Sequence, residues 1–193
     1  RILDSVKYGI DECDRLLTHN EVFLARTKGI GSISPQTAID YGCSGPILRA
    51  CGIKEDVRRS EPYSLYPSLD FDVPVGMTGD CFDRYSVRME EMRQSVRIVE
   101  QCLDRLPGGS HMGRVPRFIR PDPGEIYFRT ESPRGDYGIY LVSQGGNNPY
   151  RVKLRSPCFS NLMALREMLR DCYVADAVMV LGSLDIVLGE VDR

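Results

Sequence analysis

The feature that most constrains the fold is a seven-residue apolar repeat in the middle of the chain. Its members alternate in steps of four and three residues, and they are Tyr85, Met89, Met92, Val96, Val99, Leu103 and Leu106. This spacing places the seven side chains on one face of an α-helix. Asp80 or Asp83 can cap the start of the helix, and Pro107-Gly108-Gly109 ends it. We therefore predict a long helix whose apolar face is buried in a bundle. The opposite face is expected in solvent and carries Arg88, Glu91, Arg97, Glu100 and Asp104.

Shorter helical segments precede this helix. Apolar residues at helical spacing predict an amphipathic helix over residues 2–17 and one or two further turns over 21–26. Ser34-Pro35 begins a short helix that Gly42 ends, and Ser44-Gly-Pro46 begins another that ends at Gly52. Residues 54–79 contain several prolines and are predicted to form an irregular loop.

The chain changes character after the long helix. Residues 125–130, 138–142 and 150–155 are predicted strands, with turns at Pro133-Arg-Gly-Asp136 and Gly145-Gly-Asn-Asn148. Ser160 can cap a helix that reaches about Arg170, and Asp176 another that reaches about Leu181. Residues 182–193 are expected to form an arm. This order indicates an α+β fold, mainly helical, with a small antiparallel meander near residues 125–155.

Length and composition set limits on function. The 193 residues correspond to one domain or a large piece of one, and the start at Arg1 without methionine suggests a fragment. A net charge of −2 gives no electrostatic reason to expect a nucleic-acid partner. No apolar run approaches the roughly 20 residues of a membrane-spanning helix. The seven cysteines are widely spaced and lack C-x-x-C, which predicts reduced, mostly buried thiols.

Sequence motifs for catalysis are weak. Gly29-Ile-Gly31 lacks the third glycine of a dinucleotide-binding fingerprint, and neither His19 nor His111 has local motif partners. The carboxylates around Asp70 and Asp83 are explained as well by turns and helix caps. Composition and spacing alone therefore indicate a soluble α+β piece that depends on a partner.

Several segments taken together are similar to one family. These segments are Gly29-Ile-Gly-Ser-Ile33, Gly45-Pro-Ile-Leu-Arg49, Asp70-Phe-Asp-Val-Pro-Val-Gly76, Gly79-Asp-Cys-Phe-Asp-Arg-Tyr85, Arg88-Met-Glu-Glu-Met-Arg-Gln-Ser95, Tyr150-Arg-Val-Lys-Leu-Arg155 and Gly189-Glu-Val-Asp-Arg193. They closely resemble the subunit of NADH–quinone oxidoreductase, respiratory complex I, that is related to the large subunit of nickel–iron hydrogenases. The resemblance covers residues 1–193. It implies a hydrogenase-large-subunit-like fold, of which this chain is the C-terminal half, because the family is about twice as long.

The resemblance implies a function within an assembly. In the family, this peripheral subunit lies on the cytoplasmic side of the bacterial inner membrane, or on the matrix side in mitochondria. It packs against the subunit that carries the terminal iron–sulfur cluster, and the two enclose the quinone head-group pocket. The chain is therefore expected to be one subunit of a proton-translocating NADH:quinone oxidoreductase, with quinone as the substrate and other complex I subunits as partners.

The resemblance also singles out the end of the chain. Hydrogenase large subunits end in Asp-Pro-Cys-x-x-Cys, whose thiolates hold nickel and iron. Asp185 aligns with that Asp, whereas Val187 and Glu190 take the places of the two cysteines. A valine side chain cannot bind a metal, so we expect no metal on this chain.

The vacated space suggests a quinone-pocket role for these residues. Val187 and Leu188 suit contact with an apolar quinone ring, while Asp185, Glu190 and Arg193 are expected to orient its oxygens. The family's head-group His and Tyr, and the Asp paired with the His, lie in the other half of the protein. No residue of this chain is therefore expected to be catalytic.

Three alternatives remain open at this point. One is an energy-converting hydrogenase subunit that has lost its metal site, although Val187 and Glu190 disfavour that class. Another is a related quinone oxidoreductase subunit whose electrons come from ferredoxin or a reduced deazaflavin, because the donor binds elsewhere. The third is a structural scaffold without quinone contact.

Overall fold

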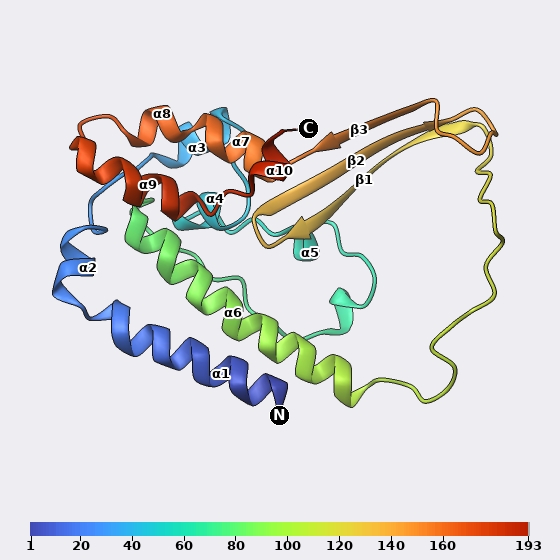
Figure 1. The fold of residues 1–193 in the computed structure, drawn as a ribbon, viewed down its shortest axis with the longest axis horizontal. Helices are drawn as coiled ribbons and strands as arrows, with labels where there is room; N and C mark the ends of the chain where they lie inside the picture. Colours follow the sequence, from blue (N-terminus) through green and yellow to red (C-terminus); the bar gives the residue numbers. More distant parts are fainter. Residues whose placement is uncertain (193) are drawn as a thin grey trace.

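The computed structural model describes residues 1–192, and it combines many short helices, one long helix and a small sheet (Figure 1). The helices are α1 (Ile2–Cys13), α2 (Glu21–Ala25), α3 (Pro35–Asp40), α4 (Pro46–Ala50), α5 (Val57–Ser60), α6 (Cys81–Asp104), α7 (Pro157–Met163), α8 (Leu165–Met168), α9 (Ala177–Leu184) and α10 (Leu188–Val191). Shorter turns of other types are the π-helix η1 (Asp14–Thr18) and the 3-10 helices η2 (Tyr66–Ser68) and η3 (Val174–Asp176). The strands are β1 (Gly124–Ser132), β2 (Gly135–Ser143) and β3 (Arg151–Arg155). The α+β class is therefore confirmed.

The long helix begins where its capping signal predicts. The Asp80 side chain accepts a hydrogen bond from the Asp83 backbone N–H at 2.8 Å, which satisfies one of the free donors of the first turn. Helix α1 runs antiparallel beside α6 (Figure 1), and Ile10, Met89 and Val96 form a small core between them. Helices of this length gain most of their stability from such packing.

The apolar face of α6 is buried only in part, so the prediction of a fully buried face was wrong. Met89 and Val96 are buried, and Tyr85 is half-buried against them. Four members of the repeat are exposed: Met92, Val99, Leu103 and Leu106. The reason is that α1 covers the face only around Met89 and Val96.

The main core lies between the first short helices and the C-terminal helices. It contains Ile33 and Ile47 from the N-terminal half, and Met168, Val180 and Leu184 from α8 and α9. The caps predicted for α3 and α4 are correct in position, with Ser34 accepting from the Thr37 N–H and Pro46 at the first position of α4. This core holds the chain's two ends together.

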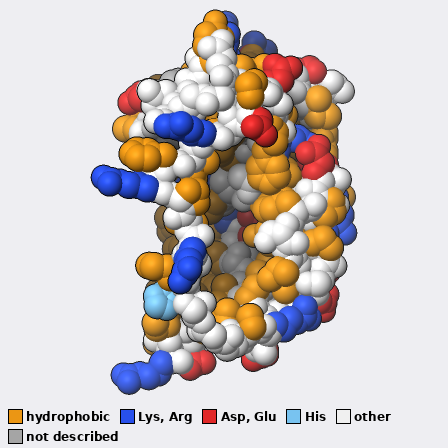
Figure 2. Space-filling view, turned by 90° about the vertical axis from the view of Figure 1, so that its right-hand side faces the viewer, with side chains coloured by type: hydrophobic (Ala, Val, Ile, Leu, Met, Phe, Trp, Pro, Cys, Tyr) orange, Lys and Arg blue, Asp and Glu red, His pale blue; other side chains and the backbone are white. Residues whose placement is uncertain are grey.

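The sheet is an antiparallel meander of order β1-β2-β3, as predicted. Its outer part projects from the body and is joined to α6 by the linker of residues 105–123 (Figure 1). Seen from that side, the surface carries hydrophobic side chains and basic side chains around a hollow (Figure 2).

The inner end of the sheet is fixed to the body by backbone contact. Gly45 has φ of 65°, and a Cβ atom there would lie 2.4 Å from the Cα of Gly135. Glycine at both positions therefore lets the β1–β2 turn touch the start of α4. The Ser44 hydroxyl accepts a hydrogen bond from the Asp136 N–H at 3.0 Å, which locks the contact.

The C-terminal region differs in detail from the prediction. Ser156, not Ser160, caps α7, because Pro157 occupies the first helical position. Asp176 does not cap α9 through its side chain and instead pairs with Arg26 at 3.0 Å. The expected arm is largely helical, since residues 182–184 complete α9 and residues 188–191 form α10.

A buried ion network joins the helices to the sheet. Arg49 on α4 is only 1% exposed, and its guanidinium bonds to Glu91 on α6 at 2.6 Å and to Glu131 on β1 at 2.9 Å. It also donates to the backbone carbonyl of Glu55 at 2.8 Å. Burial raises the pKa of both the Glu91 and the Glu131 carboxyls, and the charge of Arg49 opposes that shift. Among the described residues, none of the helices combines the length and hydrophobicity needed to cross a bilayer.

A first prediction tests the α1–α6 core. Val96 is 7% exposed, so Val96→Asp places an unpaired charge among apolar side chains. We expect a loss of about 3–5 kcal/mol in the free energy of unfolding. Urea unfolding followed by circular dichroism measures it, with exposed Ser86→Asp as the control on the same helix. Equal stability of the two variants would place Val96 at the surface.

A second prediction concerns Arg49. Arg49→Met leaves Glu91 and Glu131 without their shared cation, and we expect a loss of about 3–5 kcal/mol at neutral pH. Both carboxyls already have raised pKa values in the folded chain, so their ionised forms oppose folding and their protonated forms do not. The variant should therefore regain stability as the pH falls from about 8 to about 5.

The control for that experiment is Arg15→Met, which removes an exposed arginine paired with Glu12. Its effect should stay within about 0.5 kcal/mol across the same pH range. A pH-independent loss in Arg49→Met would show that the buried carboxylates are not the cause.

Candidate functional site

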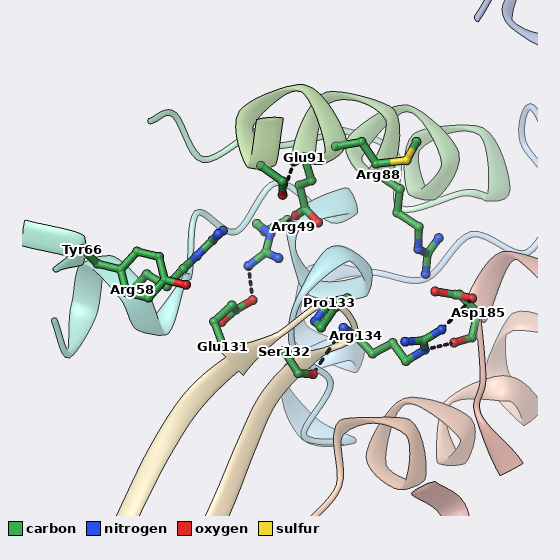
Figure 3. A pocket seen from close by; sticks show the side chains of 12 residues that line it. Arg49, Arg58, Tyr66, Arg88, Glu91, Glu131, Ser132, Pro133, Arg134 and Asp185 are labelled. Atoms are coloured by element: carbon green, nitrogen blue, oxygen red, sulfur yellow. Dashed lines mark hydrogen bonds and ion pairs between the residues drawn. The ribbon is translucent and has the colours of Figure 1, made fainter. Parts of the chain in front are cut away.

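A polar cavity of about 580 Å³ lies between α6, α5 and the β1–β2 turn (Figure 3). Its walls come from segments far apart in sequence, with Asp185 from the end of α9 closing one side. The lining residues are Arg49, Arg58, Tyr66, Arg88, Glu91, Met92, Ser95, Glu131, Ser132, Pro133, Arg134 and Asp185.

A second cavity of about 380 Å³ is mainly apolar and lies between η1, α6 and α9. Its lining includes Leu17, Phe23, Tyr85, Met89 and Met179. The two cavities have three lining residues in common, which are Arg88, Met92 and Asp185. These three therefore form a wall with a polar space on one side and an apolar space on the other.

Asp185 occupies this wall in an unusual backbone conformation. It follows the last residue of α9 with φ of 54° and ψ of 53°, in the left-handed region that non-glycine residues rarely adopt. Arg134 from the β1–β2 turn supports it twice, through its Nε to the Asp185 carbonyl at 2.8 Å and its Nη2 to Oδ1 at 3.3 Å. The turn therefore holds the backbone and the carboxylate of Asp185 together.

Arg88 reaches the same wall from α6. Its guanidinium points toward Asp185 and Arg134 in Figure 3. Its Nη1 donates to the Arg84 carbonyl at 3.1 Å, while its Nε is buried and has no hydrogen-bond partner among the described residues. Burial lowers the pKa of the Arg88 guanidinium to about 10, although the Asp185 carboxylate favours the charged form. Arg88 is therefore a cation at neutral pH.

The far end of the polar cavity is internally satisfied. Arg58 binds the Asp56 carboxylate with two hydrogen bonds of 2.9 and 2.6 Å. It also stacks over the rings of Phe71 and Tyr66, at 4.8 and 5.7 Å from their centroids. With Arg49 bonded to Glu91 and Glu131, the donors at this end already have acceptors. The wall around Arg88 is where hydrogen-bonding capacity remains.

The residues expected at the site are divided between two places. Asp185 lies at the shared wall, whereas Val187 and Leu188 lie one turn further on, 41% and 71% exposed, and line neither cavity. The Val187 N–H donates to Cys158 Sγ at 3.5 Å. Burial, and next the neighbouring Glu190 carboxyl, raise the pKa of the Cys158 thiol. Arg193 lies outside the described residues.

Several wall residues were not anticipated from the sequence. Arg88 and Glu91 belong to the helix face that we expected in solvent, and that expectation is wrong for both. Arg134 lies in the Pro133-Arg-Gly-Asp136 turn, where the sequence indicated only turn chemistry. The signal that could have found them is charge on a helix flanked by small-residue turns on both sides.

The side chains of this region do not form a metal site. Within residues 1–192, no group of three or more His, Cys, Asp or Glu side chains is placed to hold a metal ion. The seven cysteines are free, and Cys43, Cys51, Cys81 and Cys158 are buried. Burial raises the pKa of Cys43 to about 12 and of Cys51 to about 11, so these thiols stay protonated.

Comparison with known proteins gives consistent matches, all to one subunit of NADH-quinone oxidoreductase. The chain is 48% identical over its whole length to this subunit from Dehalococcoides mccartyi, covering 53% of that protein. It is 50% identical to a copy from Roseiflexus sp. over 95% of this chain and 51% of the relative. The Syntrophobacter fumaroxidans protein is 53% identical over 92% of this chain and 48% of the relative. The chain thus spans about half the length of the curated relatives it matches.

A family comparison agrees with these relatives. Residues 1–122 and 111–193 match the family described as the respiratory-chain NADH dehydrogenase, 49 Kd subunit. The two matched stretches overlap within the linker and together cover the chain. The chain therefore belongs to the family of the 49 kDa subunit of respiratory-chain NADH dehydrogenases.

Proposed function

We propose that this chain forms one wall of the quinone head-group pocket in a proton-translocating NADH:quinone oxidoreductase. The observation that carries the proposal is the wall of Arg88, Met92 and Asp185 between a polar and an apolar cavity. Membership of the 49 kDa family, whose curated relatives are named as a subunit of NADH-quinone oxidoreductase, supports it.

The chemistry of a quinone head group suits such a wall. The ring is apolar, and its two oxygens accept hydrogen bonds. Sites for such ligands combine a mainly apolar lining with a few polar groups that fix orientation. In this chain Leu17, Phe23 and Met89 supply the apolar lining, and Arg88 and Asp185 supply the polar groups.

The residues after Asp185 complete the proposed pocket. Val187 and Leu188 present exposed apolar side chains next to the wall, so they are available to a ring held between this chain and a neighbouring subunit. Glu190 and Arg193 are proposed to orient the ring oxygens from the same segment. An exposed apolar pair beside a polar group is typical of a surface that is covered on assembly.

The wider assignment follows from the same proposal. The chain is the C-terminal half of a subunit with a hydrogenase-large-subunit-like fold, and it contributes no catalytic residue. Its main partner is the subunit that carries the terminal iron–sulfur cluster, from which electrons reach quinone. The assembly couples this transfer to proton translocation, with the subunit peripheral on the cytoplasmic or matrix side of the membrane.

A third prediction tests the pocket. In the full-length subunit within the assembled complex, Val187→Met enlarges a side chain beside the ring, and we expect quinone KM or inhibitor sensitivity to change several-fold. Removal of Arg193 should lower quinone reductase activity. Electron transfer from NADH to an artificial acceptor should be unchanged in both variants, because that path ends on another subunit.

The matched control is Val178→Met, which enlarges an exposed valine of α9 away from the proposed pocket. It should leave quinone kinetics and inhibitor response unchanged. If Val187→Met and the Arg193 deletion both assemble with the quinone KM, turnover and inhibitor response of the unmodified complex, this segment is a structural scaffold.

A fourth prediction concerns metal. Because Val187 and Glu190 stand where thiolates would be needed, the purified subunit should contain no stoichiometric nickel or iron. Elemental analysis by mass spectrometry checks this. Either metal at about one atom per chain would contradict the proposal that the metal site of the related hydrogenases is lost here.

A further inference from the structure

The Arg88 guanidinium has donor capacity that the described residues do not use. Of its nitrogens, Nη1 bonds to the Arg84 carbonyl, while no described residue accepts from Nε or Nη2. A buried donor without an acceptor costs free energy comparable to a lost hydrogen bond. Such a group in a folded protein calls for an explanation, and a ligand that supplies an acceptor is one.

The carboxylates nearest to Arg88 are already engaged. Glu91, one turn along α6, is bonded to Arg49 at 2.6 Å. Asp185 is bonded to Arg134 through its Oδ1 and its backbone carbonyl. At the wall itself, two guanidiniums therefore face one carboxylate, as Figure 3 shows. The local excess of charge is positive.

The position of this cation decides what it can bind. Arg88 lines the apolar cavity together with Phe23, Met89 and Met179, where few groups compete for it. Charge–charge attraction is stronger next to apolar side chains than in water. Hydrogen bonds from a guanidinium to a charged oxygen are also stronger than those to a neutral one.

We propose that Arg88 is an anion-binding residue of the apolar cavity, and that it makes this chain hold the negatively charged form of a quinone-type ring more tightly than the neutral form. This inference rests on the proposed function, because it names the form of the ligand that the same wall favours. Asp185 and Arg134 position the opposite side of the wall. Arg84 anchors the Arg88 side chain through its backbone carbonyl.

The test compares two ring probes that differ in charge. One is 2-hydroxy-1,4-naphthoquinone, whose hydroxyl is ionised at neutral pH, and the other is its neutral methyl ether. Their inhibition constants against quinone reductase activity are measured with the intact complex that carries the full-length subunit. We expect the unmodified complex to bind the anionic probe more tightly than the ether.

The decisive variant is Arg88→Gln, which removes the charge but keeps a polar side chain. It should weaken binding of the anionic probe by about tenfold to a hundredfold. Binding of the ether should change by less than about threefold. Arg88→Lys keeps the charge without the planar fork, so it should restore part of the preference, and it also serves if Arg88→Gln fails to assemble.

Arg93→Gln is the matched control, because Arg93 lies on the same helix but pairs with Asp14, away from the wall. It should leave both inhibition constants unchanged. An equal loss for both probes in Arg88→Gln, or an unmodified complex without preference for the anion, overturns the inference and leaves the quinone pocket standing. Failure of both probes to inhibit the unmodified complex overturns the proposed function itself, and the inference with it.

Discussion

The buried guanidinium of Arg49 is the interaction on which the arrangement of this chain depends. It joins α4, α6 and β1 through single side-chain contacts to Glu91 and Glu131. An isolated charge in this position would be strongly unfavourable, and the network is stable only because all its partners are in place. Arg49 therefore couples the position of the sheet to that of the long helix.

This coupling reaches the wall through the β1–β2 turn. The close approach of Gly45 and Gly135 fixes the turn against α4, and the Asn161 amide donates to the Arg134 carbonyl at 3.0 Å. With its backbone held, Arg134 can extend to Asp185 and support its left-handed conformation. The wall is thus set by backbone contacts from three parts of the chain, and it does not depend on a flexible loop.

Local signals in the sequence predicted the elements well, because each is decided within a few residues. Ser34 and Asp80 cap the helices that they were expected to cap, and the strand pattern around Pro133-Arg-Gly-Asp136 gave the meander. Ser160 was the wrong cap because Pro157, which suits the first helical turn, moves the start to Ser156. Such competition between neighbouring signals is settled by packing.

The site was less predictable, since it is made by contacts that sequence spacing does not contain. The apolar repeat identified the face of α6 toward α1, but it could not show that a second side of the helix faces the sheet. Arg88 and Glu91 therefore had the pattern of solvated residues. Asp185 was found through the family resemblance, which marks a position but not the conformation that Arg134 imposes on it.

The chemistry of the wall explains why a chain without a catalytic residue can still matter to a redox reaction. With a pKa of about 10, Arg88 keeps its proton near neutral pH, so it is a poor proton donor there. Its charge instead changes the relative stability of ligand forms that differ in charge, which acts on the equilibrium of the reaction and not on proton delivery. Proton transfer to a bound ring would then fall to groups outside this chain, and the wall would set how much negative charge the ring can carry before it is protonated.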